Sequence, residues 1–418
     1  MPGVALPVLG ALGGALLFGS VNVDQAAYAR AEVATGVAPP APAAPAEPAL
    51  SAELRPGAAL RLRDERSLLT LRFEPRLHYR TPNPGSLDRP LLLWSGSVAH
   101  QHAITPRLGW RSNAAVSYGE VDYLDLDLAF GETAPTRELQ DPVITRFSAN
   151  AQTGFAWEVT RRYDLSIDAV ASYQIETDGV EFEPDPTMPD APEPIGLPET
   201  LVAGLDIVQS WDLDERSLLR LPVSPRFFYV SPGDDQFATS VDLIYRRLLN
   251  PRSTLEAGAG VTMVLEGEDP ISFLPRGSLA FQRVLTEANR RRAVLRLRAA
   301  LETPFDPILG DVRPLASVEA AHERELDRDW SLVFMLQAAT VTTSEPTADN
   351  SAESTGAATA IANYRVSRWF LLDFGTRLST RAPHLAASEF ELSETQAWIF
   401  CGLTVVLASS TADPSWSL

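Results

Sequence analysis

The stretch "LTLRFEPRLHYR", residues 69–80, alternates between apolar and polar side chains. Its odd positions carry Leu69, Leu71, Phe73, Pro75, Leu77 and Tyr79. Its even positions carry Thr70, Arg72, Glu74, Arg76, His78 and Arg80. A strict period of two is typical of a β-strand with one apolar face and one charged face. A soluble core has no use for that many arginines, and a solvated surface has no use for that many leucines.

The same period recurs along the chain, at 143–159, 163–175, 237–245, 253–265, 293–301 and 370–378. These strands are long, roughly 10–14 residues against about 5–6 in soluble proteins. Aromatic residues fall near their ends: Trp110, Tyr118, Trp157, Tyr163, Tyr173, Trp211, Tyr229, Tyr245 and Trp369. Long two-faced strands with aromatic ends predict an all-β, transmembrane, antiparallel up-and-down β-barrel in a bacterial outer membrane, with the apolar face to lipid and the polar face to a lumen.

The connections alternate in length. Short turns are expected at 63–67, 104–107, 159–164, 213–217, 248–253, 326–330 and 366–369. Longer acidic or Pro-rich loops are expected chiefly at 119–142, 176–199 and 342–355. In outer-membrane barrels the short turns face the periplasm and the long loops face outside. With 24–38 as the first strand, the pattern predicts about 18 strands, within a range of 16–18, and both termini in the periplasm.

Composition excludes several other classes. A net charge of −19 over 418 residues argues against nucleic acid as a partner, because phosphate binding needs a basic surface. All the basic residues are Arg, and the single Cys401 excludes a disulfide framework or a Cys-based metal site. The mean hydropathy of −0.05 leaves no room for a bundle of membrane helices.

The two ends of the chain differ from its middle. Residues 1–20 form an apolar run that predicts a signal peptide, atypical because it lacks a basic n-region and a clear A-x-A site; a helical anchor is the alternative. The barrel is expected over 24–407, followed by a short tail at 408–418. The last strand, 395–407, resembles the C-terminal β-signal of outer-membrane barrels, which implies recognition by the barrel-assembly machinery. It departs from that signal at Phe400, where a polar residue is usual.

One segment of the sequence occurs twice in similar form. "ERSLLTLRFEPRLHYRTP" at 65–82 returns as "ERSLLRLPVSPRFFYVSP" at 215–232. Each copy is expected to be a turn followed by a strand, with Pro75 and Pro225 on the lipid-facing side at β-bulges, because proline cannot donate to a ladder. Hairpin duplication explains the repeat without a special function, and a dedicated functional feature is the alternative.

The polar faces define the expected lumen. The predicted pore-lining residues are Arg72, Glu74, Arg76, His78, Arg80, Arg111, Arg146, Asn150, Gln152, Asp164, Asp168, Arg220, Arg226, Asp242, Arg296, Arg298, Asp373 and Arg377. Further inward charges are Glu158, Asp206, Arg246, Glu256, Arg276, Glu302 and Glu319. Such charges form either a solvated wall of mutual ion pairs or a transverse field that orders anionic or sugar-like solutes.

Catalytic signals are sparse. His100 and His102 share a face with Trp94 and Val98, which favours the periplasmic lipid interface over a metal site. His78 points inward, but no Ser or Asp partner follows at a defensible spacing. The acidic loops lack the spacing of an EF-hand. We therefore expect no enzyme activity, no metal and no cofactor.

Length, strand number, Arg-only composition and the absence of a plug domain resemble the myxobacterial outer-membrane barrels of polysaccharide secretion pathways. That resemblance implies an exit pore for a secreted polysaccharide, with a periplasmic polysaccharide-export protein as its partner. Three alternatives stay open: a diffusion porin with 119–142 or 176–199 folded inward as a constriction loop, a specialised uptake channel, and a non-conducting scaffold with a plugged lumen.

Overall fold

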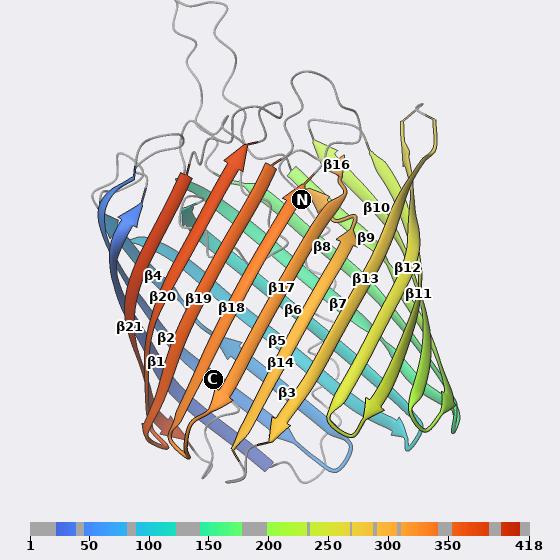
Figure 1. Ribbon diagram of the computed structural model, residues 1–418, viewed down its shortest axis with the longest axis horizontal. Coiled ribbons are helices and arrows are strands. Elements are labelled where there is room, and N and C mark those ends of the chain that lie inside the picture. The colour runs from blue at the N-terminus through green and yellow to red at the C-terminus, as the bar shows by residue number, and fades with distance from the viewer. Residues whose placement is uncertain are drawn as a thin grey trace, which may run out of the picture.

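The computed structural model describes residues 22–38, 46–81, 89–122, 143–177, 199–231, 235–267, 270–286, 291–306, 311–341, 353–383 and 394–409. These residues form a closed antiparallel β-barrel, which confirms the predicted fold class (Figure 1). Within the described ranges there is no helix that is long and apolar enough to cross a membrane. The predicted signal peptide and most of the predicted tail lie outside the described residues, as do 123–142, 178–198 and 342–352.

The main sheet contains 19 strands on 18 positions, because β3 and β4 together occupy one place between β2 and β5. β1 pairs with both β2 and β21, and this pairing closes the barrel. The count agrees with the predicted one. The wall strands are β1 Asn22–Ala38, β2 Glu47–Arg63, β3 Ser67–Phe73, β4 Arg76–Thr81, β5 Leu91–Thr105, β6 Leu108–Asp122, β7 Val143–Thr160, β8 Tyr163–Glu176, β9 Glu199–Asp214, β10 Ser217–Ser231, β11 Gln236–Asn250, β12 Ser253–Glu266, β13 Ser272–Thr286, β14 Arg292–Glu302, β17 Leu315–Glu325, β18 Trp330–Val341, β19 Glu353–Ser367, β20 Phe370–Pro383 and β21 Glu394–Ser409.

All seven predicted short turns are present, and they share one construction. Each begins with a side-chain oxygen that accepts the backbone N–H two residues later: Asp64, Thr105, Thr160, Asp214, Asn250, Asp327 and Ser367. These residue types form such turns because their short polar side chains mimic a backbone acceptor. The turn at Asp64 also holds the pKa of that carboxyl below its usual value, chiefly because Asp64 accepts the backbone N–H of Arg66.

Each of these turns is also bonded to the next hairpin. The carbonyl of the third turn residue accepts a backbone N–H from a neighbouring strand, as in Arg66 with Ala103 (2.8 Å) and Arg216 with Leu248 (2.7 Å). The same bond recurs at the other five turns, from Glu158, Asp212, Val284, Arg365 and Val406. The "DERS" stretch that begins each copy of the repeat therefore belongs to a turn type that recurs at all seven of these turns.

Neither proline of the repeat lies at a β-bulge. Pro75 lies at a break between the end of β3 and the start of β4, but the register with β2 and with β5 is the same on both sides of the break. Pro225 lies inside β10, where the pairing with β9 is interrupted at Ser224 and Pro225 without a change of register. The predicted bulges at Pro75 and Pro225 are therefore both wrong. At Pro225 the missing N–H is accommodated by a gap in one ladder, while the pairing with β11 continues.

The sheet has two distinct faces. One carries large apolar side chains that are exposed, including Leu71 (37%), Phe155 (50%) and Leu297 (42%). The other carries the charged residues, and on it side chains of one strand reach those two strands away. Only the concave side of a closed sheet brings such side chains together, so the charged face is the lumen.

Candidate functional site

The register places every predicted pore-lining residue on the lumen face. Rows of paired positions run from strand to strand, such as Arg111–Gly154–Asp168 and Asp242–Gly260–Arg276. Whether these side chains line a conducting path stays a prediction, but their mutual contacts divide the lumen into regions of different character.

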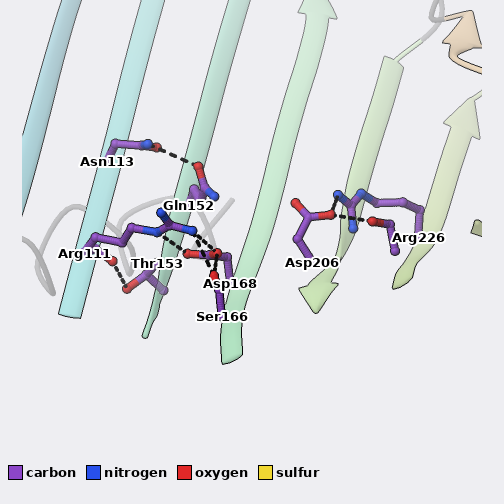
Figure 2. Close-up of polar contacts among 9 residues, drawn as sticks. Arg111, Asn113, Gln152, Thr153, Ser166, Asp168, Asp206 and Arg226 are labelled. Atoms are coloured by element: carbon purple, nitrogen blue, oxygen red, sulfur yellow. Dashed lines mark hydrogen bonds and ion pairs between the residues drawn. The ribbon is translucent and has the colours of Figure 1, made fainter. Parts of the chain in front are cut away.

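A bidentate ion pair joins Arg111 on β6 to Asp168 on β8 (Figure 2). The Arg111 Nε donates to Asp168 Oδ1 at 2.9 Å, and Nη2 donates to Oδ2 at 2.5 Å. Ser166 donates to the same carboxylate at 2.9 Å. Asp168 is only 1% exposed. The pair is therefore bidentate and held in one orientation.

A glycine on the intervening strand makes this contact geometrically allowed. A Cβ at Gly154 on β7 would lie 2.5 Å from Asp168 Oδ1 and 2.1 Å from the Ile167 carbonyl. The same arrangement joins Asp242 on β11 to Arg276 on β13, at 3.0 Å, across Gly260 on β12. We call these two glycines saddles, because each lets an ion pair lie flat across its strand.

A third pair joins neighbouring strands β9 and β10. Arg226 Nη2 lies 2.5 Å from Asp206 Oδ1, which also accepts the Ser224 hydroxyl at 2.7 Å (Figure 2). Together with the two saddle pairs, it defines what we call the paired wall, the lumen face of β6–β13.

A second charged cluster lies on the strands around the closure of the barrel. Glu53 on β2 contacts Arg55 and Arg76, with the Arg76 Nη2 at 2.6 Å, and His78 lies 3.8 Å away. Nearby, two further predicted residues lie over aromatic rings: Arg80 over Trp398 and Arg377 over Phe400. Phe400, the departure from the C-terminal signal, is thus a buried lumen residue that contacts Arg377.

The lumen face of β14, β17, β18 and β19 is different, and we call it the sparse wall. Two ion pairs lie on the described part of this face, Arg296–Glu323 at 3.8 Å and Arg298–Glu302 within one strand. All four side chains are at least 37% exposed. Much of the rest of this face consists of small or neutral residues: Ser317, Ala321, Gln337, Ala339, Ala357 and Thr359.

The remaining predicted residues have varied surroundings. Glu74 accepts the Tyr28 hydroxyl at 2.7 Å, and Gln152 accepts from Asn113 at 3.2 Å (Figure 2). Asp373 is buried, whereas Arg72 is exposed. Among the described residues, four predicted positions make no side-chain hydrogen bond or ion pair with another predicted residue: Asn150, Asp164, Arg220 and Asp373.

A short hairpin that the sequence did not reveal lies on the lumen face. We call it the inward hairpin; it contains β15 (Phe305–Asp306) and β16 (Asp311–Val312) and connects β14 to β17. Phe305 stacks on Phe228 of β10 with ring centroids 4.3 Å apart, and Val312 is 2% exposed. Their neighbours on the wall are Val202, Ala238, Val264 and Leu274.

Polar contacts also hold the base of the inward hairpin. The Thr303 and Thr262 hydroxyls are 2.5 Å apart, and Arg276 lies within 3.5 Å of both. The segment therefore crosses from its own strands, β14 and β17, onto the paired wall. The loops predicted to fold inward, 119–142 and 176–199, lie largely outside the described residues, so that prediction is not tested.

The two histidines of "HQH" lie on the outer face. His102 Nδ1 is 2.7 Å from the Ser67 hydroxyl, and His100 packs edge-on against Trp110 at 5.1 Å. Among the residues that the structure places, no group of three His, Cys, Asp or Glu side chains is arranged to hold a metal ion.

No protein-family model and no curated protein matches this sequence. In structure, the chain is similar to the FrpB iron transporter from Neisseria meningitidis, F5-1 variant, with a TM-score of 0.51 and 10% identity over 88% of this chain and 66% of that one. It spans just under two thirds of the length of the FrpB structures.

Two other solved structures cover more of their own length. OccAB2 from Acinetobacter baumannii has a TM-score of 0.46 and 9% identity, over 93% of this chain and 98% of that one. A bacterial polysaccharide outer-membrane secretin has a TM-score of 0.37 and 8% identity, over 92% and 99%. At 10% identity the likeness to the FrpB structure shows the fold alone, a large β-barrel.

Proposed function

We propose that this protein is a passive channel of a Gram-negative outer membrane that lets small polar solutes through a narrowed lumen. The observation that carries the proposal is the inward hairpin, which lies across the paired wall on the lumen side. A barrel of 16–18 strands leaves an aqueous channel once its inner side chains are in place. A segment folded into that space restricts its width.

The outer face supports a membrane location. Large apolar side chains are exposed over many strands, for example Phe334 (47%), Leu336 (59%) and Ile399 (64%), and a soluble monomer rarely exposes so much contiguous apolar area. Aromatic pairs lie on the same face next to the tight turns: Tyr163 with Trp211, and Trp330 with Tyr364. Amphipathic rings favour the headgroup level of a bilayer. We propose outer-membrane lipid and the barrel-assembly machinery as partners, and no catalytic reaction.

Polysaccharide export needs the same barrel but a wider path. The charged lumen would offer a polymer weak contacts at many sites, and in that case a periplasmic polysaccharide-export protein would be the partner. The inward hairpin, held by Phe305 and Val312, occupies lumen space that a polysaccharide chain would need, and this argues against polymer export. We therefore place diffusion of small solutes before polymer export.

Single-channel recording in planar bilayers separates these functions. We expect a stable conductance that short polyethylene glycols reduce, because they enter the lumen, while long ones and an anionic polysaccharide leave it unchanged. Block by the polysaccharide would overturn the small-solute proposal in favour of export. Absence of any conductance would overturn the channel itself and favour a plugged scaffold.

A further inference from the structure

A cavity lies beneath the inward hairpin. Its volume is about 570 Å³, and its wall comes from β7–β13 and the hairpin itself. Small-molecule sites typically occupy roughly 300–1,000 Å³, so a single sugar-sized molecule fits with water around it. The cavity lies on the lumen face, beside the path that the proposed channel function requires.

Three guanidinium groups line this cavity, those of Arg146, Arg226 and Arg276. No Asp or Glu belongs to the described lining. The carboxylates of Asp206 and Asp242, which bind Arg226 and Arg276, lie outside the lining. They fix the two guanidinium groups in place from beside the cavity. Arg226 also donates to the Leu205 and Pro225 carbonyls, and Arg276 also donates to the Thr262 and Thr303 hydroxyls. A guanidinium carries five N–H donors, so each of these two groups keeps donors for another anion.

Neutral hydrogen-bonding groups make up most of the remaining polar lining. They come from the six strands β7–β12 and include Ser148, Asn150, Ser172, Gln174, Ser224 and Ser240. Hydroxyl and amide groups both donate and accept, and so match the hydroxyls of a polyol. On the hairpin side, Phe228 and Phe305 supply an apolar surface of the kind that the C–H face of a sugar ring covers.

We propose that this cavity binds a small polyhydroxylated carboxylate, a sugar acid in size and chemistry. The guanidinium groups bind the carboxylate, the Ser, Asn and Gln side chains bind the hydroxyls, and the Phe228–Phe305 pair contacts the ring. The inference rests on the proposed channel function, because it names the solute class that the narrowed lumen selects.

Isothermal titration calorimetry of the intact detergent-purified protein tests the site directly. The probes are D-glucuronate and D-glucose, which differ at one carbon and in charge. We expect glucuronate to bind on the order of tenfold more tightly than glucose, since a charge-assisted pair supplies about that factor. Arg276→Gln should weaken glucuronate binding by a similar factor and leave glucose binding unchanged.

Two variants make the result specific. Arg298→Gln removes a lumen arginine of the sparse wall that lies outside the cavity, and it should bind glucuronate as the parent protein does. Ser172→Leu fills part of the cavity without changing any charge, and it should weaken both sugars. Heat-modifiable migration on gels confirms that each variant is folded.

Several results would overturn the site. They are equal affinity for the two sugars, no binding of either, or an equal loss in Arg298→Gln and Arg276→Gln, which would assign the preference to diffuse lumen charge. Conductance recorded on the same preparation keeps the two proposals apart. Current without glucuronate binding removes the sugar-acid site and leaves the channel, whereas binding without current removes the channel and leaves a binding site.

Discussion

The paired wall and the sparse wall are built from the same kind of strand, yet their charges are arranged differently. On the paired wall, Arg111–Asp168, Arg226–Asp206 and Asp242–Arg276 are short contacts whose carboxylates are mostly buried or bonded. On the sparse wall, Arg296 and Glu323 are 3.8 Å apart and about half exposed. One barrel thus holds fixed dipoles on one side and solvated charges on the other.

The difference shows that alternation alone does not determine how a lumen charge behaves. Charges held in one orientation keep a fixed direction toward a passing solute, whereas exposed charges move and are screened by water and salt. The inward hairpin packs on the paired wall, so the segment that we propose narrows the lumen lies on the wall with the oriented charges.

The largest effect is expected on the outer face of the sparse wall, where Leu297→Arg places a charge in lipid. Near the midplane such a change costs about 2–4 kcal/mol. Arg296→Ser, the adjacent lumen-facing change, should cost far less. Urea-induced unfolding from lipid vesicles, followed by Trp fluorescence, measures both. Equal losses would contradict the assignment of the two faces.

The next largest effect compares the two walls themselves. Asp168→Ala removes a buried carboxylate with three charge-assisted bonds and should reduce the free energy of unfolding by about 2 kcal/mol. Glu323→Ala removes an exposed partner and should cost about 0.5 kcal/mol or less. The same unfolding assay applies, and a Glu323→Ala loss as large as that of Asp168→Ala would remove the distinction between the walls.

A comparable effect is expected from filling a saddle. A Cβ at Gly260 would lie 2.1 Å from Asp242 Oδ1, so Gly260→Ala should displace the Asp242–Arg276 pair and cost roughly 1–3 kcal/mol. Gly402→Ala is the matched control, because its nearest contacts would be at an ordinary 3.5 Å. If both variants were equally stable, the saddle would have no structural role.

The smallest effect on stability is expected at the short turns, which have the same hydrogen-bonded construction at the ends of both walls. The pKa of Asp64 is lowered, so its contribution to the turn is complete above the unfolded pKa and is lost as the pH falls through the folded one. Hydrogen exchange at Arg66 N–H, corrected for intrinsic rates, should therefore accelerate in acid, while exchange at Arg252 N–H, capped by Asn250, should not. Asp64→Asn should abolish the acid sensitivity; if it persists, the carboxyl is not its source.

The sequence was sufficient to predict the two faces of the strands and the positions of the short turns. The period of two at 69–80 reflects burial of one strand face in lipid, and turn residues such as Asp64 and Asn250 act on their own backbone within two residues. Both signals are local, so no knowledge of the partner strand is needed. For the same reason the strand count and the short turns could be predicted.

The site could not be predicted in the same way, because it depends on register. Arg111 and Asp168 are 57 residues apart, and their contact requires Gly154 on the strand between them. The inward hairpin has no periodic pattern in its sequence. Only the contact between Phe305 and Phe228 of β10, a distant strand, shows that this segment packs on the lumen face. The predicted bulges at Pro75 and Pro225 were wrong for a related reason, since only the pairing of the strands shows that the register is unchanged across each proline.

Removing the inward hairpin tests directly whether this segment narrows the channel. Glu302 and Leu315 are register partners, so an Asn-Gly turn can replace 303–314 and leave the wall intact. We expect the variant without the hairpin to have a higher single-channel conductance than the parent protein and to admit larger polyethylene glycols. An unchanged conductance and size limit would contradict the claim that this hairpin narrows the channel.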